Sequence, residues 1–319
     1  AGGGSVRTTP ATTDILIIDG EGFVAGGNLT ISHNVATQSI GQFRVTSNTN
    51  LTLQSDTTTT RTTTITGGGG NDFVIESGST LNLVSTSNAC AFAFSGTGNT
   101  GDISGTLTIG GSTANIVTVS GGTSSLTTVT GTVNLQHTVI GLVGTAATLS
   151  FAAGSNCNAS AALTTAPTVP LATWNTTSTL TISGITTSTT APTNAAQSFG
   201  NLVYNCPSAT GTMSWFGTST TGVIKGDLTI TAGATCGTGI FRALTSGTLT
   251  VNGNVVVTQG RLQSASSTGT MIVSGNTTIS ANGILDVNPH TAYNQKVMLP
   301  LFHLSQKIFH LGQVSYHTL

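Results

Sequence analysis

A short unit, in which glycine precedes two apolar residues that alternate with a polar one, recurs along this chain at a nearly constant spacing. One such unit is Gly-Thr-Leu-Thr-Val, which starts at Gly247. Three units recur together as a set, with separations of 22, 22 and 23 residues: Gly247 and Gly269, Gly253 and Gly275, and Gly260 and Gly283. Self-similarity at a period of about 20 to 50 residues is typical of a solenoid, in which each repeat forms one coil.

The alternation inside each unit predicts strands. In Leu228-Thr229-Ile230 the two apolar side chains fall on one face of a strand and the threonine on the other. A meander of hairpins would need many Asn-Gly or Asp-Gly turns, and the chain has few. We therefore expect an all-β fold, a parallel β-helix (β-solenoid) with three short strands per coil of about 22 residues. The side chains expected to point inward are Leu228, Ile230, Leu249, Val251, Ile279, Leu285 and Val287.

Composition changes divide the chain into five parts. They are a leader (1–12), an N-terminal solenoid part (13–162), a Pro/Ser/Thr-rich linker or insertion (163–197), a regular solenoid (198–288) and an atypical tail or cap (289–319). Two lobes, or one solenoid interrupted near 163–197, both fit this division. Glycine becomes rare after residue 288, where four of the six histidines lie. The tail is either a cap for the open end of the solenoid or a segment foreign to it.

The low charge excludes several functions. Only 5% of the 319 residues are charged, and the formal net charge is -1. Such a chain lacks the basic surface with which proteins bind nucleic acid. It has no run of 18 apolar residues, so no transmembrane helix is predicted. The first residues, Ala1-Gly-Gly-Gly, lack a basic and apolar leader. We expect an exported protein, extracellular or on the cell surface, whose signal peptide has been removed.

The cysteines give no metal-binding or redox motif. None of the four belongs to a Cys-x-x-Cys pair; they are Cys90, Cys157, Cys206 and Cys236. Two disulfides could form in an oxidising compartment, but four buried thiols are the favoured interpretation.

Several segments of the chain resemble one family. They are Asp14–Gly20, Ile40–Val45, Gly67–Leu83, Trp174–Ser178, Gln197–Cys206 and Ile224–Ile230. These segments resemble parts of secreted surface proteins of Bacteroidetes with Thr/Gly-rich β-solenoid repeats. The resemblance implies export by the type IX secretion route. It also implies O-glycosylation of Thr57, because Asp56-Thr57-Thr58 fits the short Asp-Ser/Thr pattern of these bacteria.

A carbohydrate-active enzyme, a polysaccharide lyase or glycosidase, is the alternative function. Asp72 and Glu76 would lie on one face of a strand about 13 Å apart, beyond the roughly 5 to 9.5 Å that glycoside hydrolysis uses. A second acidic cluster is Asp14, Asp19 and Glu21, and a lyase would also need Ca²⁺ and a basic residue. The regular region offers only Lys225, Asp227, Arg242, Arg261 and Asp286. The favoured role of all these residues is solvation of corners and strand ends, so no catalytic, cofactor or metal site is predicted.

Histidines and aromatic residues give weaker indications. His33 and His137 are isolated, and His303, His310 and His317 recur every seven residues without an acidic partner. Trp174 and Trp215 could form a sugar-stacking platform, but such residues more often fill a core.

We therefore expect a non-catalytic structural or adhesive protein that is a homo-oligomer or homopolymer, such as a fibre or surface-layer subunit. A poorly capped solenoid end and a nearly uncharged surface favour association. Residues 1–13 or 289–319 are expected to contact a neighbouring subunit, and a polysaccharide or another surface is a candidate ligand. A second alternative is binding of ice or a similar surface. It would need Thr-x-Thr in register over many coils, whereas these phrases are interrupted by Asn, Gln and Ser.

Overall fold

The computed structural model confirms the predicted fold class. It describes residues 10–20, 28–35, 37–67, 70–121, 124–136, 141–160, 168–187, 190–217, 221–231, 239–265, 269–286 and 293–294. Every helix or strand in these residues is a strand. The chain is an all-β parallel solenoid of about nine turns, with three strands per coil.

The chain divides into two compact units. Unit 1 comprises Ala1–Ser155 and Pro170–Thr173, and unit 2 comprises Asn156–Val169 and Trp174–Leu319. The short strand β18 (Thr173–Trp174) falls at the boundary between these ranges. Each unit is described by itself.

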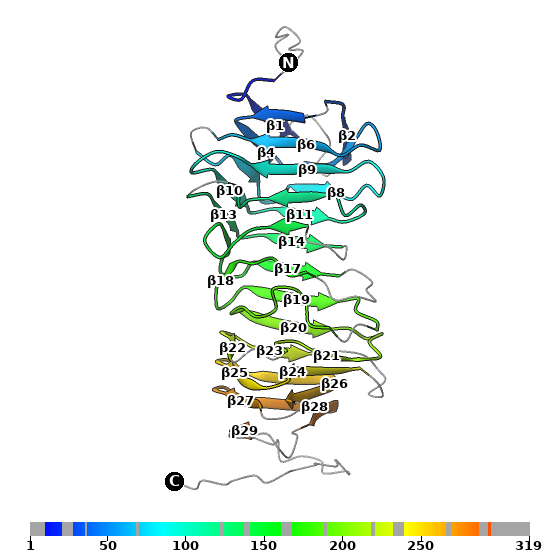
Figure 1. The fold of residues 1–319 in the computed structure, drawn as a ribbon, viewed down its shortest axis with the longest axis vertical. Helices are drawn as coiled ribbons and strands as arrows, with labels where there is room; N and C mark the ends of the chain where they lie inside the picture. Colours follow the sequence, from blue (N-terminus) through cyan, green and yellow to red (C-terminus); the bar gives the residue numbers. More distant parts are fainter. Residues whose placement is uncertain are drawn as a thin grey trace. The chain divides into compact units, whose positions relative to one another are not determined.

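In unit 1, every third strand of the chain belongs to the same sheet, and neighbours pair in parallel (Figure 1). The first sheet contains β1 (Ile15–Asp19), β4 (Gln42–Thr46), β7 (Phe73–Ile75), β10 (Thr100–Ile103), β13 (Leu126–Val129) and β16 (Leu149–Phe151). The second contains β2 (Asn28–His33), β5 (Asn50–Ser55), β8 (Thr80–Leu83), β11 (Thr106–Ile109) and β14 (Thr132–Leu135). The third contains β3 (Thr37–Ile40), β6 (Arg61–Ile65), β9 (Cys90–Phe94), β12 (Ile116–Thr118) and β15 (Leu142–Val143).

Unit 2 continues the same parallel pattern. One series of paired strands consists of β17 (Asn156–Ala159), β19 (Thr179–Ser183), β20 (Asn201–Asn205), β23 (Leu228–Ile230), β26 (Val255–Ala265) and β28 (Thr277–Asp286). The second half of β26 also pairs with β24 (Ile240–Leu244), which pairs with β21 (Thr212–Ser214). A separate sheet contains β22 (Thr221–Ile224), β25 (Gly247–Val251), β27 (Gly269–Val273) and β29 (Tyr293–Asn294).

The repeat in the sequence is the pairing register of the coils. Gly247 pairs with Gly269, and Gly260 pairs with Gly283, so residues that recur in sequence lie beside one another. The coil length is not constant, however, because Asn50 pairs with Thr80, 30 residues later. The strands keep their length, and the additional residues lie in the turns between them.

The alternation of apolar and polar residues produces the core. Among the predicted inward residues, Leu228, Ile230, Leu249 and Val251 are fully buried. Ile279 and Leu285, on the last long strand, are half-buried. Val287 lies outside the described residues. The core of unit 1 also contains aromatic rings: the ring centroids of Phe43 and Phe92 are 4.7 Å apart, and those of Phe73 and Phe92 are 5.3 Å apart.

The segment 163–197 contributes to the solenoid. Its strand β19 has the sequence Thr-Leu-Thr-Ile-Ser and pairs in parallel with β17 and with β20. The described part of this segment therefore is not simply a linker, because its alternating residues bury Leu180 and Ile182 as in the other coils.

Glycines at the coil corners permit close stacking. A Cβ placed on Gly253 would lie 2.6 Å from the carbonyl carbon of Gly226 in the preceding coil. No side chain fits this contact, which explains why a glycine opens so many of the sequence units.

Candidate functional site

The first strand exposes apolar side chains at an open sheet edge. Ile15, Leu16 and Ile17 of β1 are 54%, 43% and 52% exposed. Leu16 pairs with the buried Phe43 of β4 and points toward the core side, so Ile15 and Ile17 point outward. Among the described residues β1 pairs with β4 alone. Its other edge therefore presents the backbone groups with which a further strand could pair.

Two carboxylates bracket this edge. Asp14 precedes β1, where its Oδ2 accepts a hydrogen bond from the backbone N–H of Ala11 at 2.8 Å, and Asp19 ends the strand. If two copies of β1 paired antiparallel about their centres, Asp14 of one copy would face Asp19 of the other. Like charges directly opposite one another destabilise a strand pair. The edge is therefore better suited to a strand from a different part of a neighbour.

The sequence contained a signal for this surface that the residue analysis did not use. Ile15-Leu-Ile-Ile18 is a continuous apolar run, which is typical of a strand covered on both faces. The predicted subunit contacts were placed in residues 1–13 and 289–319, most of which lie outside the described residues.

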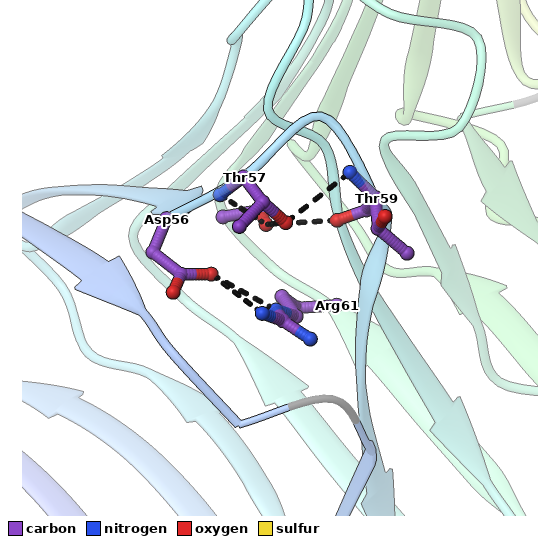
Figure 2. Close-up of polar contacts among 5 residues, drawn as sticks. Asp56, Thr57, Thr59 and Arg61 are labelled. Atoms are coloured by element: carbon purple, nitrogen blue, oxygen red, sulfur yellow. Dashed lines mark hydrogen bonds and ion pairs between the residues drawn. The ribbon is translucent and has the colours of Figure 1, made fainter.

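The turn between β5 and β6 presents Thr57, the residue implied as an O-glycosylation site. Thr57 is exposed. Its backbone N–H donates a hydrogen bond to the hydroxyl of Ser55 at 3.1 Å, and its own hydroxyl accepts one from the backbone N–H of Thr59 at 3.3 Å. Arg61 donates two hydrogen bonds to Asp56, at 3.0 and 2.8 Å. Figure 2 shows how these contacts fix the turn around Thr57.

Two other ionisable side chains lie near the same turn. Burial lowers the pKa of His33, and the positive charge of Arg61 lowers it further, while Gln38 and Asp56 oppose the shift. Burial raises the pKa of the Cys90 thiol to about 11, although the charge of Arg61 acts against it. His33 and Cys90 are thus neutral near pH 7, and the charges at this turn are those of the Asp56–Arg61 pair.

The two tryptophans do not form a sugar-stacking platform. Trp174 and Trp215 are 1% and 0% exposed, and both rings contact Phe199, at centroid distances of 5.5 and 6.0 Å. The indole N–H of Trp174 donates a hydrogen bond to Gln197 at 3.0 Å. The coil of unit 2 is wide enough to enclose both rings, so they serve as core residues.

The acidic residues considered for catalysis have structural contacts. Asp72 is 2% exposed and accepts a hydrogen bond from the backbone N–H of Thr100 at 2.8 Å. Glu76 accepts one from the backbone N–H of Ser47 at 3.3 Å. Glu21 lies outside the described residues. Within those residues, no group of three or more His, Cys, Asp or Glu side chains could hold a metal ion.

The charged residues of the regular region also bind neighbouring coils. Lys225 donates to the backbone carbonyl of Trp174 at 2.6 Å, and Arg242 donates to Gln263 at 2.6 Å. Arg261 forms an ion pair with Asp286. These contacts account for basic residues that a lyase reaction could otherwise use.

The cysteines described by the structure are free thiols. Cys90, Cys157 and Cys206 are buried and unpaired, so they form no disulfide with one another. Cys236 lies outside the described residues, as do His137 and the four histidines after residue 288. In the described part of the chain, no helix is long and apolar enough to cross a membrane.

No protein-family model, no curated protein and no solved structure matches the chain.

Proposed function

We propose that the chain is a non-catalytic structural or adhesive protein that self-assembles outside the cell or on its surface. The observation that supports this proposal is the open, apolar edge of β1. An exposed strand with large apolar side chains on both faces is a template for pairing with another chain. The burial of apolar surface would add to the backbone hydrogen bonds in such a contact.

The charges at the edge favour head-to-tail assembly. Asp14 and Asp19 disfavour pairing of two β1 strands, as described above. The segment 289–319 has no carboxylate side chain and contains Lys296 and Lys307, so its charge complements that of the β1 edge. A contact between two different surfaces repeats without closing unless the rotation forms a ring. The expected assembly is therefore a homopolymer, such as a fibre or a surface-layer array.

A matched pair of variants tests this proposal. Leu16→Lys places a charge on the open edge, whereas Leu126→Lys places one on β13, which pairs on both sides and where the leucine is 45% exposed. Sedimentation velocity and electron microscopy of the intact chain should show polymers for the parent protein and for Leu126→Lys. Leu16→Lys should remain monomeric. A monomeric parent protein at micromolar concentration would contradict the proposal.

We also propose that the chain is exported by a bacterium of the Bacteroidetes and carries a glycan on Thr57. The resemblance described above and the exposure of Thr57 support this proposal. Cleavage after Arg44 and Arg61 gives a peptide that contains Thr57. Mass spectrometry of protein expressed in such a host should show added hexose mass on this peptide. The mass should disappear in Thr57→Ala and persist in Thr58→Ala, and an unmodified parent peptide would refute the assignment.

A further inference from the structure

The second sheet of unit 1 has a regular polar outer side, here named the Asn/Thr face. Two columns of side chains run across its five strands, β2, β5, β8, β11 and β14. The first column is Asn28, Asn50, Thr80, Thr106 and Thr132, and the second is Thr30, Thr52, Asn82, Thr108 and Asn134. The pairing register places each residue beside the next member of its column. In the sequence these positions seemed scattered, because the coils that separate them differ in length.

Hydrogen bonds between coils hold part of the face in place. The amide of Asn50 donates to Asn28, and that of Asn82 donates to Asn50 at 2.9 Å. The amide of Asn134 donates to the hydroxyl of Thr108 at 3.4 Å. Side chains that are already ordered lose little conformational entropy when they bind a ligand.

Three successive hydroxyls of the first column remain available. Thr80, Thr106 and Thr132 are half-buried, and within the described residues their hydroxyls have no hydrogen-bond partner. Adjacent strands lie about 4.8 Å apart, so these hydroxyls form a row with that spacing. Each hydroxyl can both donate and accept a hydrogen bond.

We infer that the Asn/Thr face binds an uncharged, extended polysaccharide that lies across the strands. The face contains no Lys, Arg, Asp or Glu. It therefore offers no counter-charge to an anionic polysaccharide, whose carboxylates would lose hydration without compensation. An uncharged chain of hydroxyl-bearing rings matches both the neutrality of the face and the row of donors and acceptors. Many weak contacts along a repeating ligand add up to useful affinity.

The asparagines favour this ligand over ice. A planar ice surface needs the same group at every position of the array, and the amides of Asn50, Asn82 and Asn134 interrupt the hydroxyls. An amide beside a hydroxyl suits a sugar chain, whose ring and hydroxyl oxygens present alternating donors and acceptors. Ice binding is therefore an outcome that the experiment must separate.

The test uses the intact chain and insoluble polysaccharides. We expect sedimentation with microcrystalline cellulose or chitin, both uncharged and extended, and none with calcium alginate beads. The variant T80V/T106V/T132V keeps the β-branched shape and removes three hydroxyls, so binding should fall about tenfold or more. The control T62V/T64V makes the same change on β6 of the third sheet, where both threonines are half-buried, and should bind like the parent protein.

The outcomes that overturn the inference are distinct. Absence of binding to both neutral polysaccharides would overturn it, as would unchanged binding by the triple valine variant. Inhibition of ice growth without polysaccharide binding would assign the face to ice instead. If the triple variant melts at a lower temperature, Thr106→Lys serves as the second variant, because it keeps the outward position polar and should also abolish binding.

This inference rests on the adhesive part of the proposed function and is separable from assembly. Leu16→Lys should lose polymers and still bind cellulose or chitin. The triple valine variant should still polymerise and lose that binding. Each failure therefore identifies which proposal is wrong.

Discussion

The carboxylate of Asp227 accepts a hydrogen bond from the backbone N–H of Asn254, one coil further along, at 2.6 Å. The same arrangement precedes and follows it. Asn201 accepts from the N–H of Asp227 at 2.8 Å, and Asn254 accepts from the N–H of Asn276 at 2.9 Å. Each of these four residues follows a glycine. The corner of unit 2 is thus a ladder in which one side chain per coil satisfies the backbone of the next.

The ladder predicts different effects for two substitutions of Asp227. Asp227→Ala removes the acceptor and leaves the N–H of Asn254 without its partner, which should cost about 1–3 kcal/mol of unfolding free energy. Asp227→Asn keeps an acceptor oxygen, as in the other three rungs, and should cost less than about 1 kcal/mol. Urea unfolding measures both. Equal destabilisation by the two variants would show that the charge, and not the ladder, matters.

The corner glycine of the same coil predicts a steric effect. Gly253→Ala would press its Cβ against Gly226, with the carbonyl oxygen and carbon of that residue at 2.6 Å. Backbone atoms cannot move aside easily, so we expect a loss of about 1–3 kcal/mol. Gly217→Ala is the comparison, since it has open space but a φ of 56° and should cost about 1 kcal/mol for conformational strain alone. A smaller loss at Gly253 than at Gly217 would contradict the close-stacking explanation.

The repeat made the coil predictable from sequence, and the reason is local. The 22-residue recurrence coincides with the pairing of Gly247 with Gly269, and the alternation at Leu228 and Ile230 correctly predicts burial. Both features depend only on residues near in sequence or on a constant spacing. The Asn/Thr face and the corner ladder were not predicted, because they depend on which residues of unequal coils lie side by side.

Burial of the tryptophans could not be decided from sequence for a related reason. Residue type alone leaves an indole equally suited to a sugar and to a core. The enclosure of Trp215 depends on Phe199 and Phe241, which come from other coils. The exposure of Leu16 has the opposite cause, since no described strand lies beyond β1.

A core substitution tests the inward direction of the alternating residues. Leu249 is fully buried, and its neighbour Thr250 points outward and is half-buried. Leu249→Asp places a carboxylate in an apolar core without a partner and should cost about 4 kcal/mol or more. Thr250→Asp changes the same strand on its outer side and should cost less than about 1 kcal/mol. Thermal unfolding followed by circular dichroism compares them, and similar melting temperatures would place Leu249 outside the core.

Buried thiols predict a loss of stability at alkaline pH. Burial raises the pKa of Cys206 from its ordinary value of 9.0 to about 11. Above pH 9 the unfolded chain releases this proton while the folded chain keeps it. The unfolded state then binds fewer protons, so the free energy of unfolding falls as the pH rises from 9 to 11. Because thiolates are the reactive form, alkylation of native Cys206 at pH 8 should also be slow and should accelerate in urea. Cys206→Ala removes the titrating group while keeping a small apolar side chain, so its unfolding free energy should decline less steeply over this pH range. Urea titrations of both proteins at pH 8, 9, 10 and 11 provide the comparison. Parallel pH profiles, together with rapid alkylation of the folded parent protein, would show that the thiol of Cys206 reaches solvent and that its burial does not control its ionisation.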